Sequence, residues 1–229
     1  MRCGLFGKLI AKRDFIALFA PKTFLAVWEP WMQGSIAASR DRLGGGWQSA
    51  FLSAPIWRFW LGPEICGATV AGVFMPSLDG VGRYYPLTLF AYADPGSAIA
   101  PPDIDAQHDW FHGAEEYLLT TLDKDVPFER TAAALDQFAP PAALPVQQSG
   151  GESVTIADGT LAAHATDTTL PDLFTTLRTA NFASIYSAAS FWWTLGGDNY
   201  QPFALCCRRM PDPFVFSNML TGRLDPVNS

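Results

Sequence analysis

The sequence has little charge, and positive charge is the scarcer kind. Of its 229 residues, 16% are charged and 49% are apolar, with 15 lysines and arginines against 22 aspartates and glutamates. A disordered chain would be poor in apolar residues and rich in charge, so this composition excludes one. A general nucleic-acid binder needs a basic surface to meet the phosphates, so a net charge of −7 argues against that class as well. We expect a folded domain with a sizeable core.

Long hydrophobic runs are also absent. No stretch reaches the roughly 18 apolar residues that a membrane helix needs, so we expect no insertion into a membrane. Four charged residues interrupt any apolar core of a secretion signal near the start of the chain, namely Lys8, Lys12, Arg13 and Asp14. The protein is therefore expected in the cytoplasm.

Cysteine is scarce, with four residues in the chain. Without a secretion signal, Cys3, Cys66, Cys206 and Cys207 are expected to be reduced and buried rather than paired in disulfides. Cys206 and Cys207 are adjacent and lie in an apolar stretch. This favours two buried, inert thiols over a redox-active pair.

Common catalytic motifs are missing too. The sequence contains no Gly-x-Ser-x-Gly elbow, no GxxxxGK[ST] phosphate loop and no cysteine pairs at zinc spacing. One arrangement leaves a metal-assisted enzyme as an alternative, because His108, His112 and Glu116 recur every four residues and would share one face of a helix. Asp109 stands where the helical metalloprotease motif has its glutamate base, and His164 is the only other histidine. We therefore expect no catalysis and no cofactor.

Apolar stretches separated by short turns predict an antiparallel sheet. Residues 67–75 and 84–92 are small or apolar almost throughout, which is typical of strands buried on both faces. Further strands are expected at 3–10, 184–195 and 203–208, and a hairpin turn at Asp158-Gly159. Adjacent strands joined by short turns favour an antiparallel arrangement over a doubly wound parallel one.

Helical spacing of apolar residues predicts several helices around this sheet. They are expected at 24–43, 47–53, 105–122, 127–138, 170–179 and 214–220. Pro30 should kink the first helix or mark its true beginning, and Asp103 or Asp105 should cap the 105–122 helix. The fold class that follows is α+β, with residues 1–229 forming a single domain whose central, mainly antiparallel sheet has helices on both faces. Residues 139–153 are low in complexity and predict a surface connection.

Aromatic residues are abundant, with eight tryptophans in one domain. Core packing explains most of them, but tryptophan beside arginine is also typical of protein–protein contacts. The run Trp57-Arg58-Phe59-Trp60 has this composition. We expect one of its two tryptophans to remain partly exposed.

Charge is distributed unevenly along the chain. Residues 1–92 carry a net charge of +4, from nine basic and five acidic residues, and residues 93–229 carry −11, from six and seventeen. Nine of the acids fall within 103–136, where Lys124 and Arg130 are the only basic residues. Two interpretations remain open: solvated helix faces, or an acidic surface that attracts a basic partner.

Asp79 and Arg83 lie four residues apart in the loop that joins two expected core strands. They predict either an ion pair that locks the turn or a pair that contacts a ligand.

Several stretches resemble those of a known protein family. They include Gly4–Leu9, Asp14-Phe15, Trp28–Gln33, Ala54–Phe59, the long string from Gly72 to Thr88, Ser190–Thr194 and Met210-Pro211. Together they resemble the TagF (ImpM) family, accessory proteins of bacterial type VI secretion systems. Residues 93–183 match only weakly, and Arg13 stands where the family usually has glycine.

The resemblance implies regulation rather than catalysis. Proteins of this family repress type VI secretion after translation by binding, notably to a scaffold protein with a forkhead-associated (FHA) domain. We therefore expect an FHA-domain scaffold as the partner, with a structural subunit of the secretion apparatus as a further alternative. The residues expected to serve partner binding or the fold are Trp57, Arg58, Ser77, Asp79, Arg83, Trp192 and Trp193.

Overall fold

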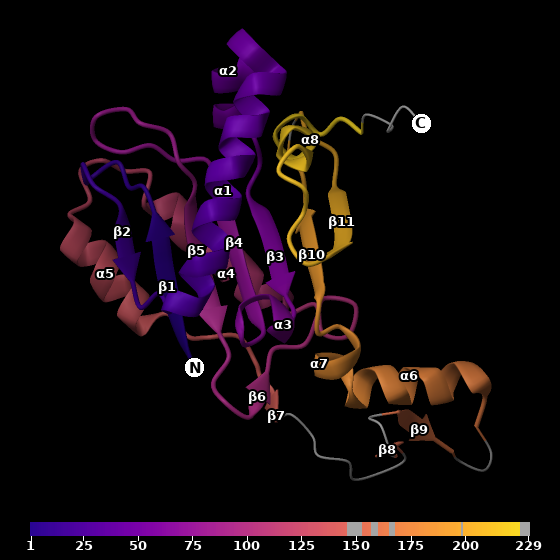
Figure 1. Ribbon diagram of the computed structural model, residues 1–229. Helices are drawn as coiled ribbons and strands as arrows, with labels where there is room; N and C mark the ends of the chain where they lie inside the picture. The colour runs from indigo at the N-terminus through magenta and orange to yellow at the C-terminus, as the bar shows by residue number, and fades with distance from the viewer. Residues whose placement is uncertain (146–152, 157–159, 165–167, 198, 225–229) are drawn as a thin grey trace.

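A seven-stranded sheet forms the centre of the computed structural model, which describes residues 1–145, 153–156, 160–164, 168–197 and 199–224 (Figure 1). The strand order is β11-β10-β3-β4-β5-β1-β2, and each neighbouring pair runs antiparallel. The strands are β1 Arg2–Gly7, β2 Ile16–Leu18, β3 Trp57–Leu61, β4 Val70–Met75, β5 Leu87–Tyr92, β10 Ala189–Thr194 and β11 Phe203–Arg208. The expected α+β fold with a central antiparallel sheet is confirmed.

Helices cover both faces of this sheet, which gives three layers (Figure 1). One face carries α1 Lys22–Leu43, α2 Trp47–Ser53 and α8 Val215–Thr221, and the other carries α4 His108–Thr120 and α5 Phe128–Gln137. A short turn of 3₁₀ helix, Gly44–Gly46, joins α1 to α2, and α3, Pro63–Cys66, packs beside α1. Among the described residues, no helix combines the length and apolar character needed to cross a bilayer.

Smaller elements lie at the lower end of the sheet in Figure 1. They are β6 Ser97–Ala98 paired with β7 Leu144–Pro145, β8 Ser153–Thr155 paired with β9 Leu161–Ala163, α6 Leu170–Ala180 and α7 Phe182–Ile185. The β8–β9 pairing confirms the expected hairpin, although its turn at Asp158-Gly159 lies outside the described residues. Of the expected connection 139–153, residues 146–152 likewise lie outside them.

Two hydrophobic cores lie on opposite faces of the sheet. In β3, Trp57 and Phe59 enter the core beneath α1 and α8, whereas Trp60 enters the core beneath α4. Successive side chains of a strand point to opposite faces, so a strand without polar alternation is one that is covered on both sides. This explains why the central strands are apolar almost throughout.

Three expectations at the ends of elements are wrong. Pro30 does not mark the beginning of α1, which starts at Lys22 and runs through Pro30, because its buried face, which includes Phe24, Trp28 and Trp31, stabilises the turns on both sides of the missing hydrogen bond. Gln107, the residue before helix α4, has a left-handed backbone conformation, and neither Asp103 nor Asp105 caps the helix. The expected strand 184–195 begins only at Ala189, because the residues before it form α7 and a turn.

The tryptophans of β3 are both buried. Trp57 and Trp60 are each 1% exposed, and their indole nitrogens donate to the carbonyl oxygens of Met219 (3.0 Å) and Ile99 (2.9 Å). The expectation that one of them stays partly exposed is wrong. Strand β3 lies inside the sheet and is covered on both faces, so its side chains are buried whichever face they point to.

The cysteines differ in burial, and all four are free thiols. Cys3 and Cys66 are buried as expected, but Cys206 is exposed and Cys207 is half-buried. The expectation of two buried thiols in β11 is wrong because β11 is an edge strand, in which alternate side chains remain accessible.

Alkylation of the native protein should distinguish these thiols. We expect iodoacetamide to modify Cys206 first and to leave Cys3 and Cys66 unmodified until the protein unfolds, because burial raises the pKa of each of the latter to about 12. Peptide mass mapping after timed labelling measures this order. Labelling of Cys66 as fast as Cys206 would contradict it, and a Cys206→Ser variant identifies the fast site.

Candidate functional site

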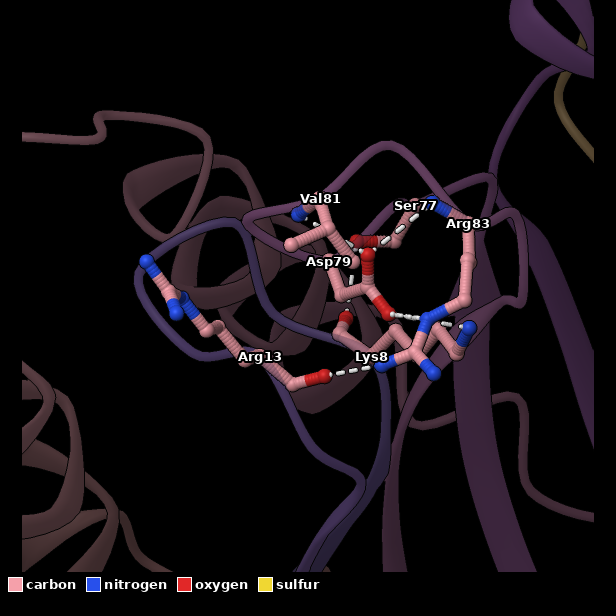
Figure 2. A network of polar contacts seen from close by, with 6 residues as sticks. All are labelled: Lys8, Arg13, Ser77, Asp79, Val81 and Arg83. Carbon is pink, nitrogen blue, oxygen red and sulfur yellow. Dashed lines mark hydrogen bonds and ion pairs between the residues drawn. The ribbon is translucent and has the colours of Figure 1, made fainter.

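The loop between β4 and β5 folds around the carboxylate of Asp79, which has no solvent exposure (Figure 2). Lys8 Nζ lies 3.0 Å and Arg83 Nε 2.7 Å from Asp79 Oδ2. The other carboxylate oxygen accepts hydrogen bonds from the backbone N–H groups of Val81 (3.1 Å) and Arg83 (2.9 Å). The aspartate is thus surrounded by donors from its own loop and from the segment that follows β1.

These donors determine the charge state of Asp79. Burial by itself would raise the pKa of this carboxyl group. The backbone N–H of Arg83, the Lys8 ammonium and the Arg83 guanidinium outweigh that effect and hold the pKa well below its usual range. Asp79 is therefore ionised at neutral pH. The Lys8 side chain is 7% exposed, so each buried charge depends on the other.

The same loop is fastened to the turn between β1 and β2. Ser77 Oγ donates to the Lys8 carbonyl oxygen at 2.8 Å, and the Arg83 guanidinium donates to the carbonyl oxygen of Arg13 (Figure 2). The Gly80 N–H donates to the Lys12 carbonyl oxygen at 2.7 Å. Of the two interpretations of Asp79 and Arg83, the structure shows the ion pair that locks the turn. Lys8, its third member, was missed because nothing in a single sequence marks a lysine 71 residues away as a partner.

A second buried ion pair joins the sheet to α4. Arg58 of β3 donates from Nε and from its terminal Nη2 to the two oxygens of Glu115, at 2.6 and 2.9 Å. The Arg58 side chain is 3% exposed and that of Glu115 is 17% exposed. This bidentate ion pair fixes the orientation of α4 about its own axis relative to the sheet. In the sequence, Glu115 stood out only as one of the nine acids.

The tryptophans expected at a site are mostly core residues. Trp192 has no exposure, and its ring stacks on Phe59 with centroids 5.5 Å apart. Trp193 is half-buried and packs against Phe111 at 4.9 Å. Trp57 and Trp192 therefore stabilise the fold from positions that a partner does not reach. Of the seven expected residues, Arg83 and Trp193 keep the most accessible surface.

The three residues of the metal alternative lie on the outer face of α4 and are exposed. His112 Nε2 is 3.4 Å from Glu116 Oε1. Across the described part of the chain, no three histidine, cysteine, aspartate or glutamate side chains are placed to hold a metal ion. The spacing of His108, His112 and Glu116 therefore does not produce a metal site.

The acidic residues of 103–136 divide into two groups. Five of them lie near a basic group: Asp103 near Arg178, Glu115 near Arg58, Glu116 near His112, Glu129 near Lys12 and Asp136 near Arg2. Asp105, Asp109, Asp123 and Asp125 have no ion-pair partner among the described residues. Four of the nine acids are therefore without an ion-pair partner in the described part of the chain, and Lys124 lies between two of them in the sequence.

An open groove lies at the end of the sheet, between α2, α4 and the turn that leaves β10. Its volume is about 780 Å³, and Ile56, Leu119 and Leu195 are among its lining residues. A second hollow of about 240 Å³ shares Ile56 and Leu119 with it and extends to Leu52 and Leu122. The two hollows thus lie side by side at these two residues, and we call them together the α4 groove.

Comparison with known proteins identifies the family. Residues 4–138 match the family described as "TagF N-terminal domain, Type VI secretion system-associated". The crystal structure of PA0076 from Pseudomonas aeruginosa PAO1 superposes with a TM-score of 0.81 at 30% identity, covering 99% of this chain and 97% of that chain. A comparison with curated proteins gave no match. The protein belongs to the TagF family of type VI secretion-associated proteins.

Proposed function

We propose that this protein is a non-catalytic, cytoplasmic repressor of type VI secretion that acts by binding an FHA-domain scaffold protein. The family supports the association with type VI secretion. The observation that carries the non-catalytic role is the placement of the polar residues in the family-like stretches. Asp79 is enclosed by Lys8 and Arg83, and Arg58 is enclosed by Glu115.

Such residues are poor candidates for chemistry. A catalytic acid, base or nucleophile has to reach a substrate, and its pKa has to lie near the working pH. Asp79 has no exposure, and its pKa is lowered rather than raised. In contrast, the α4 groove offers an accessible, partly apolar surface of the kind that proteins use to bind one another.

Deletion of the gene in its host tests the proposal. A repressor predicts increased release of a secreted effector into the medium, and reduced release when the protein is overproduced. A structural subunit predicts the opposite, because loss of an apparatus component abolishes secretion. Purified wild-type protein should also co-purify with the FHA scaffold. Unchanged secretion together with no recovery of the scaffold would overturn the proposal.

A further inference from the structure

We propose that strand β11 pairs antiparallel with β11 of a second copy of this chain, so that two seven-stranded sheets join into one. The inference does not depend on the proposed function. It follows from the backbone groups that β11 leaves unpaired, from the apolar side chains beside them, and from the register in which the strand matches itself.

The two edges of the sheet differ in how they are protected. Strand β2 is three residues long, the charged residues Arg13 and Asp14 lie just before it, and Phe19 follows it with a left-handed backbone (φ 50°). Short, charged or distorted edges of this kind prevent another strand from adding to a sheet. Strand β11, at the right margin of the sheet in Figure 1, is six residues long and contains no proline, lysine or acidic residue. Its single charged residue, Arg208, is its last.

Alternate backbone groups of β11 point away from the sheet. The Arg209 N–H donates to the Ala188 carbonyl oxygen at 2.6 Å, in the same register as the β10–β11 pair. Hydrogen-bonded and non-hydrogen-bonded positions alternate along an antiparallel pair, so every second residue before Arg209 faces β10. The residues whose N–H and C=O groups face outward are Ala204, Cys206 and Arg208. Among the described residues, no strand pairs with that side of β11.

Apolar side chains at this edge remain partly uncovered. Phe203, Leu205 and Cys207 pack against the core beneath α1 and α8, but all three are only half-buried. That core therefore runs to the edge of the sheet and is not closed there. The occupant that completes it is an extended strand with apolar side chains on the same face.

Strand β11 meets this requirement itself. A two-fold axis perpendicular to the sheet turns the strand end for end and keeps each face on its own side. With the axis at Cys206, the two Cys206 residues lie opposite each other, and Ala204 lies opposite Arg208 of the second copy. Each of these pairs exchanges two N–H···O bonds, so the outward-facing groups of β11 all gain partners.

The side chains suit this register as well. Leu205 lies opposite Cys207 of the second copy, so the apolar residues of both strands extend one core. The small Ala204 lies opposite the long Arg208, and the two Arg208 residues are four positions apart along the join, roughly 13 Å. Like charges directly opposite each other are unfavourable, and this register avoids them.

Sedimentation equilibrium of the full chain under reducing conditions tests the pairing. Because one strand from each copy makes the contact, we expect a dimer with a dissociation constant of about 10–100 µM, weaker than a standard interface. Cys206→Pro removes the central outward N–H but none of the bonds to β10, and should raise that constant about tenfold or more. Cys206→Ser keeps the N–H and should associate like the wild type. A wild type that stays monomeric up to about 500 µM overturns the inference.

Variants of Ala204, which is exposed, test the register without altering the backbone. Ala204→Lys places lysine opposite Arg208 of the second copy and should weaken the dimer about threefold, whereas Ala204→Glu should strengthen it about threefold. Overall charge predicts the reverse order, because each chain carries −7. Adding Arg208→Glu to Ala204→Glu should cancel the gain, since two acids then face each other.

The same measurements decide against the inference if another surface is used. A dimer whose dissociation constant is unchanged by Cys206→Pro and by both Ala204 variants does not pair through β11. A dimer that Ala204→Lys strengthens and Ala204→Glu weakens follows overall charge and contradicts the register. Circular dichroism melting confirms that each variant is folded, and the Ala204 variants keep the test decisive if Cys206→Pro is not.

Discussion

Replacing Asp79 with asparagine is expected to lower the free energy of unfolding by about 3–5 kcal/mol, the usual cost of removing one partner of a buried ion pair. The substitution leaves Lys8, 7% exposed, without its counter-charge, and places an amide NH2 donor where Asp79 Oδ2 faces the Lys8 ammonium and the Arg83 guanidinium. For a domain of this size, the melting temperature should fall by roughly 6–20 °C. Thermal and urea unfolding measure the change.

The effect of Asp79→Asn should also depend on pH. The pKa of Asp79 is lowered in the folded protein, so its ionised form stabilises the fold at any pH above the ordinary aspartate value. That contribution is lost as the pH falls from about 3.9 toward the lower folded-state pKa. The stability difference between wild type and Asp79→Asn should therefore be constant near neutral pH and shrink in acid. A difference that grows in acid would contradict the assignment.

Arg83→Ala serves as the matched control in the same network. The Arg83 side chain is 59% exposed, so its ion pair with Asp79 is screened by water and should contribute less than about 1 kcal/mol. Lys8 remains to balance Asp79 in this variant. If Arg83→Ala left both folding and scaffold binding intact, Arg83 would be removed from the candidate site. Equal destabilisation by the two substitutions would show that burial does not govern this network.

The second large effect is expected at the pair that joins β3 to α4. Glu115→Leu leaves the guanidinium of Arg58, with a side chain 3% exposed, buried and unpaired. We expect the free energy of unfolding to fall by about 3–5 kcal/mol, because the remaining charge has neither water nor a counter-ion. Urea unfolding of the purified variant measures the loss.

The double variant Arg58→Met/Glu115→Leu tests the cause. Both charges are removed and apolar groups of similar length replace them, so stability should recover to within about 1 kcal/mol of the wild type. A double-mutant cycle then gives the coupling energy of the pair. If the double variant were as unstable as Glu115→Leu, packing at α4 rather than an unpaired charge would explain the loss.

The central strands were predictable because their sequence pattern already requires burial. Residues 70–75 and 87–92 contain scarcely a polar side chain, and a strand of that kind is stable only when both of its faces are covered. For the turn between them, the sequence offered the Asp79–Arg83 ion pair as one of two interpretations, and only the structure chose between them. The family resemblance depended on this same segment, and the match over residues 4–138 confirms it.

The position of each strand within the sheet was not predictable. Strand β10 lies 128 residues after β3 in the chain but pairs with it, so β3 becomes an interior strand and both of its tryptophans are buried. Strand β11 pairs on one side only, so Cys206 is exposed despite its apolar neighbours. Burial depends on which segments become neighbours, and the local pattern is the same in both cases.

Local patterns in the sequence therefore determined the class of fold, most of its helices and strands, and the family. Only the tertiary structure decided that Lys8 balances Asp79, that Arg58 binds Glu115, and that leucines from α2, from the end of α4 and from the turn after β10 line the α4 groove. The physical reason is range. Backbone periodicity and turns act over a few residues and can be read along the chain, whereas burial, charge pairing and surface shape depend on residues that only folding brings together.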